Sequence, residues 1–84
     1  MAKQKIEGLM TQLHERFASS DTSPQQEALL QQLRSQLAEW DGPTPADGNV
    51  VTTTELLLDE LEEQHPHMTQ IVKEILDTLG RLGI

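Results

Sequence analysis

The sequence predicts an all-α fold, an antiparallel bundle of three or four helices that forms a single domain over residues 1–84. Apolar residues recur at steps of three and four through three segments, which is the period of a helix with one buried face. The large apolar residues are nearly all aliphatic, with Phe17 and Trp40 as the only aromatics, and such a set suits helix-on-helix packing. With 84 residues the chain can build only one modest core.

The first helix is expected from Ala2 to Ala18. Five apolar residues form its buried stripe: Ile6, Leu9, Met10, Leu13 and Phe17. A second helix is expected from Pro24 to Trp40, because Ser23 can cap it and Pro24 suits a first helical position. The short turn between the two helices predicts that residues 1–40 form an antiparallel hairpin.

The segment Asp41–Thr53 is predicted to be an acidic loop without regular helix. Its two Pro and two Gly residues, with Asp-Gly at 41–42 and 47–48, are turn signals. Val50 and Val51 could pack on the bundle as a short extended piece. Thr52 and Glu55 match a capping box, which places the start of the third helix near Thr53.

The C-terminal segment, residues 54–84, carries the most regular apolar pattern and one anomaly, the His65-Pro66 step. It forms either one kinked helix or two helices joined by a sharp turn. We favour two helices, Thr53–Gln64 and Pro66–Leu82, because an interior proline costs about 3 kcal/mol and Pro66 suits a helix start. His65 would then face the core at the turn and hydrogen-bond a freed carbonyl.

The end of the last helix is predicted from its glycines. If Gly83 adopts the left-handed conformation after Leu82, the side chain of Ile84 packs back on Leu79 in a Schellman closure. Gly80 is the alternative stop, but its partner residue would be the charged Arg81. We therefore assign structural roles to Pro66, Leu79, Gly83 and Ile84.

The net charge of −8 is concentrated in the middle of the chain. No Lys or Arg lies between Ser35 and Val72, whereas eight acids do: Glu39, Asp41, Asp47, Glu55, Asp59, Glu60, Glu62 and Glu63. Such a stretch repels phosphate backbones and anionic membranes, so we expect neither direct nucleic-acid binding nor membrane binding. The acids form either a solvated helix face or a surface for a basic partner.

No cysteine, no apolar run at the N-terminus and no stretch of about twenty apolar residues occur, so we expect a soluble, cytoplasmic protein. His14, His65 and His67 are the candidate metal ligands. His65 and His67 are two residues apart and do not share a helix face, so no metal or cofactor is expected. No nucleophile with an adjacent base and no phosphate-binding glycine loop is recognisable, and we do not expect an enzyme.

The function that these observations favour is a non-catalytic protein–protein interaction or regulatory module. The alternative is an acidic mimic that occupies a basic nucleic-acid-binding surface on a partner protein. The candidate partner contacts are Trp40, Asp59, Glu60, Glu62, Glu63 and His65. Leu57, Ile71 and Leu76 widen the C-terminal stripe, so a second neighbour must cover it, either the hairpin or a second copy in a homodimer.

The run Glu55-Leu-Leu-Leu-Asp-Glu-Leu-Glu-Glu-Gln-His-Pro66 resembles the bacterial domain-of-unknown-function family 4404. The resemblance continues through Ile71, Ile75, Leu76, Leu79 and the ending Leu82-Gly83-Ile84. Proteins of this family are similar in length and also combine a leucine-rich N-terminal segment with a Glu-rich helix and a His-Pro step. Over residues 1–40 only a general leucine periodicity is shared. The resemblance implies a bacterial cytoplasmic protein and transfers no catalytic, cofactor or metal residue.

Overall fold

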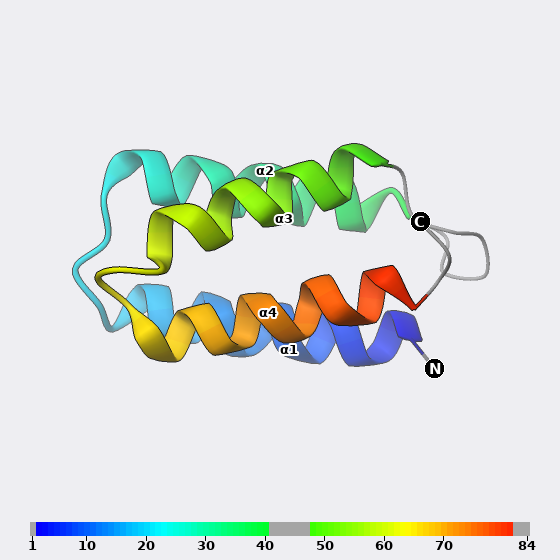
Figure 1. The fold of residues 1–84 in the computed structure, drawn as a ribbon, viewed down its shortest axis with the longest axis horizontal. Coiled ribbons are helices and arrows are strands. Elements are labelled where there is room, and N and C mark those ends of the chain that lie inside the picture. Colours follow the sequence, from blue (N-terminus) through cyan, green and yellow to red (C-terminus); the bar gives the residue numbers. More distant parts are fainter. Residues whose placement is uncertain (1, 41–47, 82–84) are drawn as a thin grey trace.

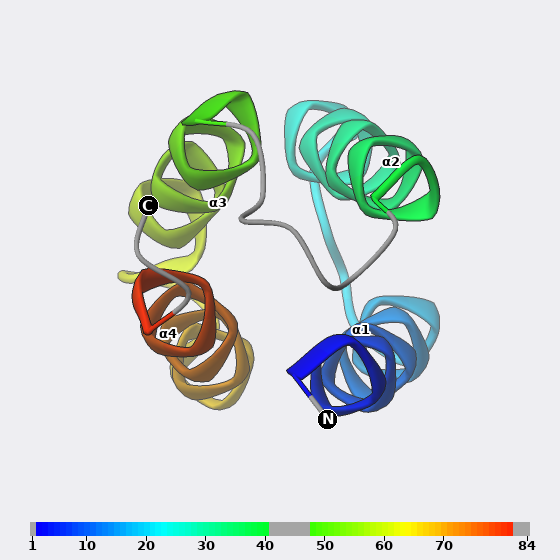
Figure 2. The ribbon, with the colours of Figure 1, turned by 90° about the vertical axis from the view of Figure 1, so that its right-hand side faces the viewer.

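A computed structural model of the chain describes residues 2–40 and 48–81 and shows an antiparallel four-helix bundle. The helices lie at the corners of a square when the bundle is viewed end on (Figure 2). Within the described ranges no strand is present, so the predicted all-α fold is confirmed. The helices are α1 (Ala2–Ala18), α2 (Pro24–Ala38), α3 (Gly48–Leu61) and α4 (Pro66–Gly80).

The four neighbouring helix pairs do not pack equally. α1 packs closely on α4, α2 on α3 and α3 on α4, whereas α1 and α2 approach each other at few positions. α1 and α2 are antiparallel, as predicted for a hairpin. Each of them, however, packs mainly on a helix of the C-terminal half, α1 on α4 and α2 on α3. Both short turns, between α1 and α2 and between α3 and α4, lie at the same end of the bundle (Figure 1).

The sequence prediction for α1 and for the start of α2 is confirmed. Ser23 is the N-cap of α2, its Oγ accepts a hydrogen bond from the backbone N–H of Gln26, and Pro24 occupies the first turn. Gln26 completes a reciprocal capping box, because its Oε1 accepts from the backbone N–H of Ser23. α2 ends at Ala38, two residues before the predicted end at Trp40, and Glu39 is its C-cap.

The predicted loop over Asp41–Thr53 is wrong in its second half, because α3 already begins at Gly48. Val50 and Val51 are helical rather than extended, and the Oγ1 of Thr52 donates to the carbonyl of Gly48 instead of capping a helix start. Tertiary burial explains the extra turn: Val50 and Thr53 continue the buried stripe of α3 toward its N-terminus. Glycine costs little at a helix end, and each threonine hydroxyl bonds to a carbonyl four residues back.

The predicted break at His65-Pro66 is confirmed. α3 ends at Leu61, three turn residues follow, and Pro66 starts α4. The apolar stripes of α3 and α4 are also out of phase. Steps of three and four counted back from α4 through His65 and Leu61 reach Leu58, yet Leu57 is the fully buried residue and Leu58 is only partly buried. The apolar spacing of α4 therefore does not predict which residues of α3 are buried, because the proline turn separates the two helices.

α4 ends at Gly80, so the predicted helix end at Leu82 is wrong. Gly80 is the last helical residue, and it does not adopt the left-handed conformation that the alternative stop at this glycine required. Arg81 is the C-cap in a right-handed helical conformation, and its guanidinium pairs with Asp77 at 3.1 Å on the surface. The proposed closure of Gly83 and Ile84 on Leu79 lies outside the described residues, although Leu79 itself is fully buried.

One core runs through the bundle and includes Leu13, Leu33 and Leu61, which are completely buried. α3 and α4 each have two neighbouring helices, so most of the wide C-terminal stripe is covered within the chain. A second copy is therefore not needed to cover that stripe. In the part of the chain that the structure describes, no helix has both the length and the hydropathy to cross a bilayer.

Candidate functional site

The residues that the sequence proposed as partner contacts fall at opposite ends of the bundle. Trp40 follows α2 at the end away from the two short turns, and it is 7% exposed. Asp59, Glu62 and Glu63 are exposed and lie near the α3–α4 turn. Glu60 and His65, at the same end, are partly buried. The six residues therefore belong to two separate surfaces and cannot form one contact.

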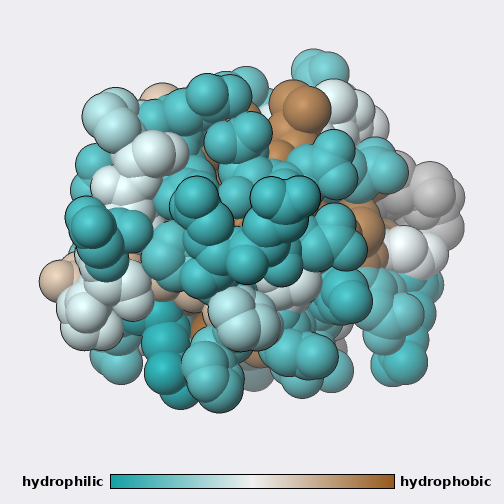
Figure 3. Space-filling model, turned by 60° about the vertical axis from the view of Figure 1, so that its left-hand side comes forward, coloured by the Kyte–Doolittle hydropathy of each residue, from teal (hydrophilic) through white to brown (hydrophobic). Residues whose placement is uncertain are grey.

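The first surface, which we call the acidic end, combines the two short turns and the helical residues that flank them. Segments 15–27 and 59–67 carry seven carboxylates and one guanidinium, that of Arg16. The remaining described residues carry five acids and five Lys or Arg residues, so they are neutral as a set. Hydrophilic side chains dominate the face that includes this end (Figure 3). The carboxylates are Glu15, Asp21, Glu27, Asp59, Glu60, Glu62 and Glu63.

Gln26 holds the two halves of the acidic end together. Its side chain is almost completely buried, and its Nε2 donates a hydrogen bond of 3.1 Å to the backbone carbonyl of Glu60. The same side chain closes the capping box of Ser23 through Oε1. One amide thus links the start of α2 to the last turn of α3 and fixes the acids of the two turns relative to each other.

His65 lies at the α3–α4 turn as the N-cap of α4. Its backbone N–H donates to the carbonyl of Leu61, and its own carbonyl accepts from the backbone N–H and the Oγ1 of Thr69. The predicted side-chain bond to a freed carbonyl is not found: the imidazole makes no capping bond, and Nε2 is buried without a partner among the described residues. The hydrogen bonds of His65 to Leu61 and Thr69 therefore come from its backbone and not from its side chain.

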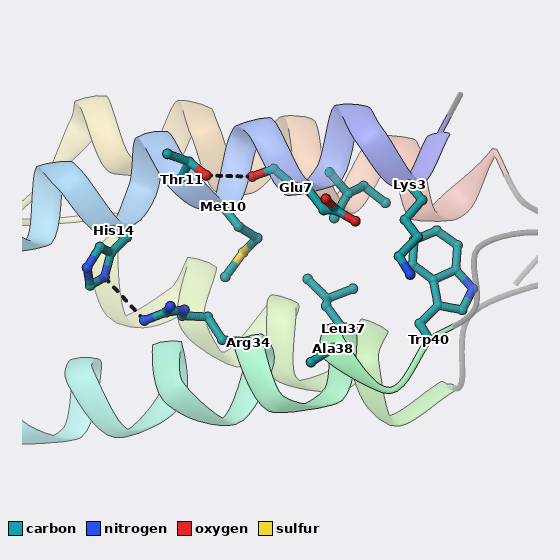
Figure 4. Close-up of a pocket in the computed structure, with 10 residues that line it drawn as sticks. Lys3, Glu7, Met10, Thr11, His14, Arg34, Leu37, Ala38 and Trp40 are labelled. Atoms are coloured by element: carbon teal, nitrogen blue, oxygen red, sulfur yellow. Dashed lines mark hydrogen bonds between the residues drawn. The ribbon is translucent and has the colours of Figure 1, made fainter.

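The second surface is a groove between α1 and α2, where the two helices pack least closely. It has a volume of about 420 Å³ (Figure 4). Its floor is apolar and comes from both helices, with Ile6 and Met10 on α1, Leu37 on α2, and Trp40 just beyond it. The edges are polar, and their residues are Lys3, Glu7, Thr11, His14 and Arg34, with Ala38 beside them.

Arg34 and His14 bridge one end of the groove, because Nη1 of Arg34 lies 3.4 Å from Nδ1 of His14. Lys3 and Trp40 lie together near the other end (Figure 4). His14, which the sequence analysis considered only as a weak metal candidate, therefore lies at the edge of a concave site. Within residues 2–40 and 48–81, no group of three or more His, Cys, Asp or Glu side chains could hold a metal ion.

Sequence reasoning missed the groove and half of the acidic end. A signal for the acidic end was available, because an antiparallel four-helix arrangement places both short turns at one end and so adds Asp21 and Glu27 to the α3 acids. No local signal predicts the groove. It depends on α1 and α2 preferring other neighbours, which is a property of the assembled bundle.

The comparisons with known proteins give the family but no activity. The model of the domain-of-unknown-function family DUF4404 matches residues 2–84, including the N-terminal hairpin, where the sequence had shown only leucine periodicity. No curated protein and no solved structure matches the chain. Because the family match covers nearly every residue, the chain belongs to the DUF4404 family, whose function is unknown.

Proposed function

We propose that this protein is a non-catalytic protein-interaction module whose acidic end contacts a basic surface on a partner protein. The observation that carries the proposal is the distribution of charge: the acidic end has seven carboxylates and one Arg, while the other described residues balance. A concentrated field of one sign accelerates encounter with an oppositely charged partner and orients it. Six of the seven carboxylates are exposed, and Glu60 is partly buried.

Stability does not explain the acids of α3. Asp59 lies in the last turn of that helix, at the negative end of its dipole, and Glu62 and Glu63 lie in the turn between that end and the start of α4. They also repel one another. The mutual repulsion and the position of Asp59 oppose folding, which is the pattern expected where a surface is maintained for binding at some cost in stability.

Three hydroxyl groups in or next to the acidic end, those of Ser19, Ser23 and Thr69, have structural roles, which supports a non-catalytic module. Ser23 Oγ caps α2, and Ser19 Oγ donates to the carbonyls of Glu15 and Arg16 at the end of α1. Thr69 Oγ1 bonds to the carbonyl of His65. These groups serve helix ends rather than a reactive centre.

Capture from a lysate of the native cell tests the proposal. The acidic-end variant is Asp59→Asn with Glu62→Gln and Glu63→Gln, and the matched variant is Glu39→Gln with Glu55→Gln and Glu74→Gln. All six residues are exposed, and both variants have a net charge of −5 because each removes three charges from −8. The wild type and the matched variant should retain a salt-sensitive partner that the acidic-end variant loses.

The same variants test the stability argument. Neutralising Asp59, Glu62 and Glu63 should raise the free energy of unfolding by about 1 kcal/mol, because it removes one charge from the negative end of the α3 dipole and relieves the repulsion among the three acids. Urea unfolding followed by circular dichroism measures this change. Lost binding together with a gain in stability excludes misfolding as the reason for the loss. A destabilised acidic-end variant would contradict the proposed cost.

The narrower alternative is that the partner surface normally binds nucleic acid and that the acidic end mimics a phosphate backbone. The gathering of carboxylates from two turns at one end favours it, because a mimic needs several charges close together in space. Duplex DNA should then compete with this protein for the captured partner, and the competition should weaken steeply with salt. A partner that binds both molecules at once would contradict the mimic.

We also propose that the protein is bacterial, that it is cytoplasmic and that it forms a homodimer. The absence of cysteine fits a reducing compartment. Among residues 2–40 and 48–81, Leu56 on α3 is the exposed large apolar residue that a second copy would cover, at 51% exposure. Sedimentation of the purified chain tests the dimer: a dimeric mass that Leu56→Gln converts to a monomeric mass supports it, and a monomeric wild type at high concentration contradicts it.

A further inference from the structure

We propose that the α1–α2 groove is a binding site for an anionic amphiphile, an unbranched aliphatic carboxylate. Its hydrocarbon chain would lie along the apolar floor, and its carboxylate would meet Arg34 at the edge. The site uses residues that the acidic end does not use, so it goes beyond the interaction function proposed above. Experiments can therefore contradict the ligand site without contradicting the partner contact at the acidic end, and the reverse.

The dimensions and lining of the groove suit a slender apolar chain. On α1 the lining runs from Lys3 to His14, which is eleven residues apart, or about 16 Å at the rise of an α-helix. The volume of about 420 Å³ lies in the range of small-molecule pockets, about 300–1,000 Å³. An apolar floor with a few polar groups at the edge is the usual composition of such pockets.

The charges at the groove favour a negative headgroup near Arg34. Arg34 and Lys3 are two of the six Lys and Arg residues in a chain of net charge −8. Neither has a carboxylate within ion-pair distance among the described residues. The guanidinium keeps donors beyond its contact with His14, and it matches a carboxylate in two-pronged geometry. Glu7 lies closer to the Lys3 end, where it would repel a carboxylate (Figure 4).

The burial of the floor argues against a helix as the occupant. Ile6, Met10, Leu37 and Trp40 are each between 1% and 8% exposed. A helix that docks in a groove needs wide apolar walls, because it is about 10–12 Å across and gains affinity from the area that it covers. Little of these four side chains is left for a helix to cover, and a single alkyl chain, which is much narrower than a helix, needs less exposed apolar area.

Trp40 provides a direct readout, because it lines the groove and is the only tryptophan in a chain without tyrosine. Its fluorescence should change saturably when decanoate is added below the concentration at which decanoate forms micelles. Decylammonium is the matched probe, with the same chain and the opposite charge. The net charge of −8 would attract the ammonium and repel the carboxylate, so a preference for decanoate can only come from a local site.

Variants assign the headgroup contact. Arg34→Gln should weaken decanoate binding about tenfold, because it removes a charge-assisted hydrogen bond. Arg16→Gln removes the same charge from an exposed position on α1 that does not line the groove, and it should leave the affinity unchanged. The acidic-end variant should also bind decanoate like the wild type. Circular dichroism checks that each variant is folded.

Three outcomes would overturn the proposal. One is the absence of a saturable Trp40 response to decanoate. Another is equal or tighter binding of decylammonium. The third is equal weakening by Arg34→Gln and Arg16→Gln, which would assign the effect to net charge. If an amphipathic acidic peptide changes Trp40 fluorescence and decanoate does not, the groove binds a polypeptide and the assigned ligand class is wrong.

Discussion

Replacing Gln26 with Ala should destabilise the protein far more than the same change at Gln25. Both residues are in the first turn of α2, but Gln25 is exposed and Gln26 is 3% exposed. The Gln26 side chain makes two hydrogen bonds that alanine cannot make, one with the N–H of Ser23 at 3.0 Å and one with the carbonyl of Glu60 at 3.1 Å. At about 1 kcal/mol each, their loss lowers the free energy of unfolding by about 2 kcal/mol.

Urea unfolding followed by circular dichroism measures this loss. With the small denaturant slope expected for a chain of 84 residues, the midpoint should fall by about 1–2 M for Gln26→Ala. Gln25→Ala should leave it nearly unchanged. A third variant, Gln26→Glu, separates the two bonds: its carboxylate can still accept from Ser23, but it cannot donate to Glu60 and it faces a carbonyl oxygen. Gln26→Glu should therefore be no more stable than Gln26→Ala.

Equal losses of stability in Gln26→Ala and Gln25→Ala would contradict this prediction. That result would mean that the amide bridge between α2 and α3 contributes nothing beyond helix propensity. A Gln26→Glu variant as stable as the wild type would place all of the stabilisation in the capping box and none in the bond to Glu60.

Three further substitutions test the packing. Leu61→Ala should cost about 2–5 kcal/mol because Leu61 is completely buried, whereas Leu56→Ala on the same helix should change unfolding by less than about 0.5 kcal/mol. Thr54→Val should be nearly neutral, since the methyl group suits the core and the only bond lost from the hydroxyl is the one to the Val50 carbonyl; a loss above about 2 kcal/mol contradicts this. Pro66→Ala should lower stability by about 0.5–1 kcal/mol with helicity unchanged, because Pro66 already has the geometry of a first helical position; a more stable variant would favour a continuous helix.

Periodicity and caps predicted most of the fold. Ser23 and Pro24 marked the start of α2, and Pro66 marked the start of α4, because each signal acts within a few residues. The start of α3 could not be read in the same way. Gly48 and the threonines that follow have low helix propensity, and they are helical because Val50 and Thr53 are buried against the bundle.

The candidate sites show the same division between local and tertiary information. The acids of α3 were visible in the sequence, but their union with Asp21 and Glu27 depends on the turns meeting at one end. Trp40 was predicted to be a partner contact. It is buried, and it also lines a groove that exists because α1 and α2 pack mainly on other helices.

Whether the acidic end is the contact surface can be measured as a ratio of dissociation constants, those of the captured partner with the two charge variants. Both variants have the same net charge, so only the location of the missing carboxylates differs. If the acidic end is the contact surface, the variant at Asp59, Glu62 and Glu63 should bind at least about tenfold more weakly than the variant at Glu39, Glu55 and Glu74. Equal dissociation constants would contradict the claim.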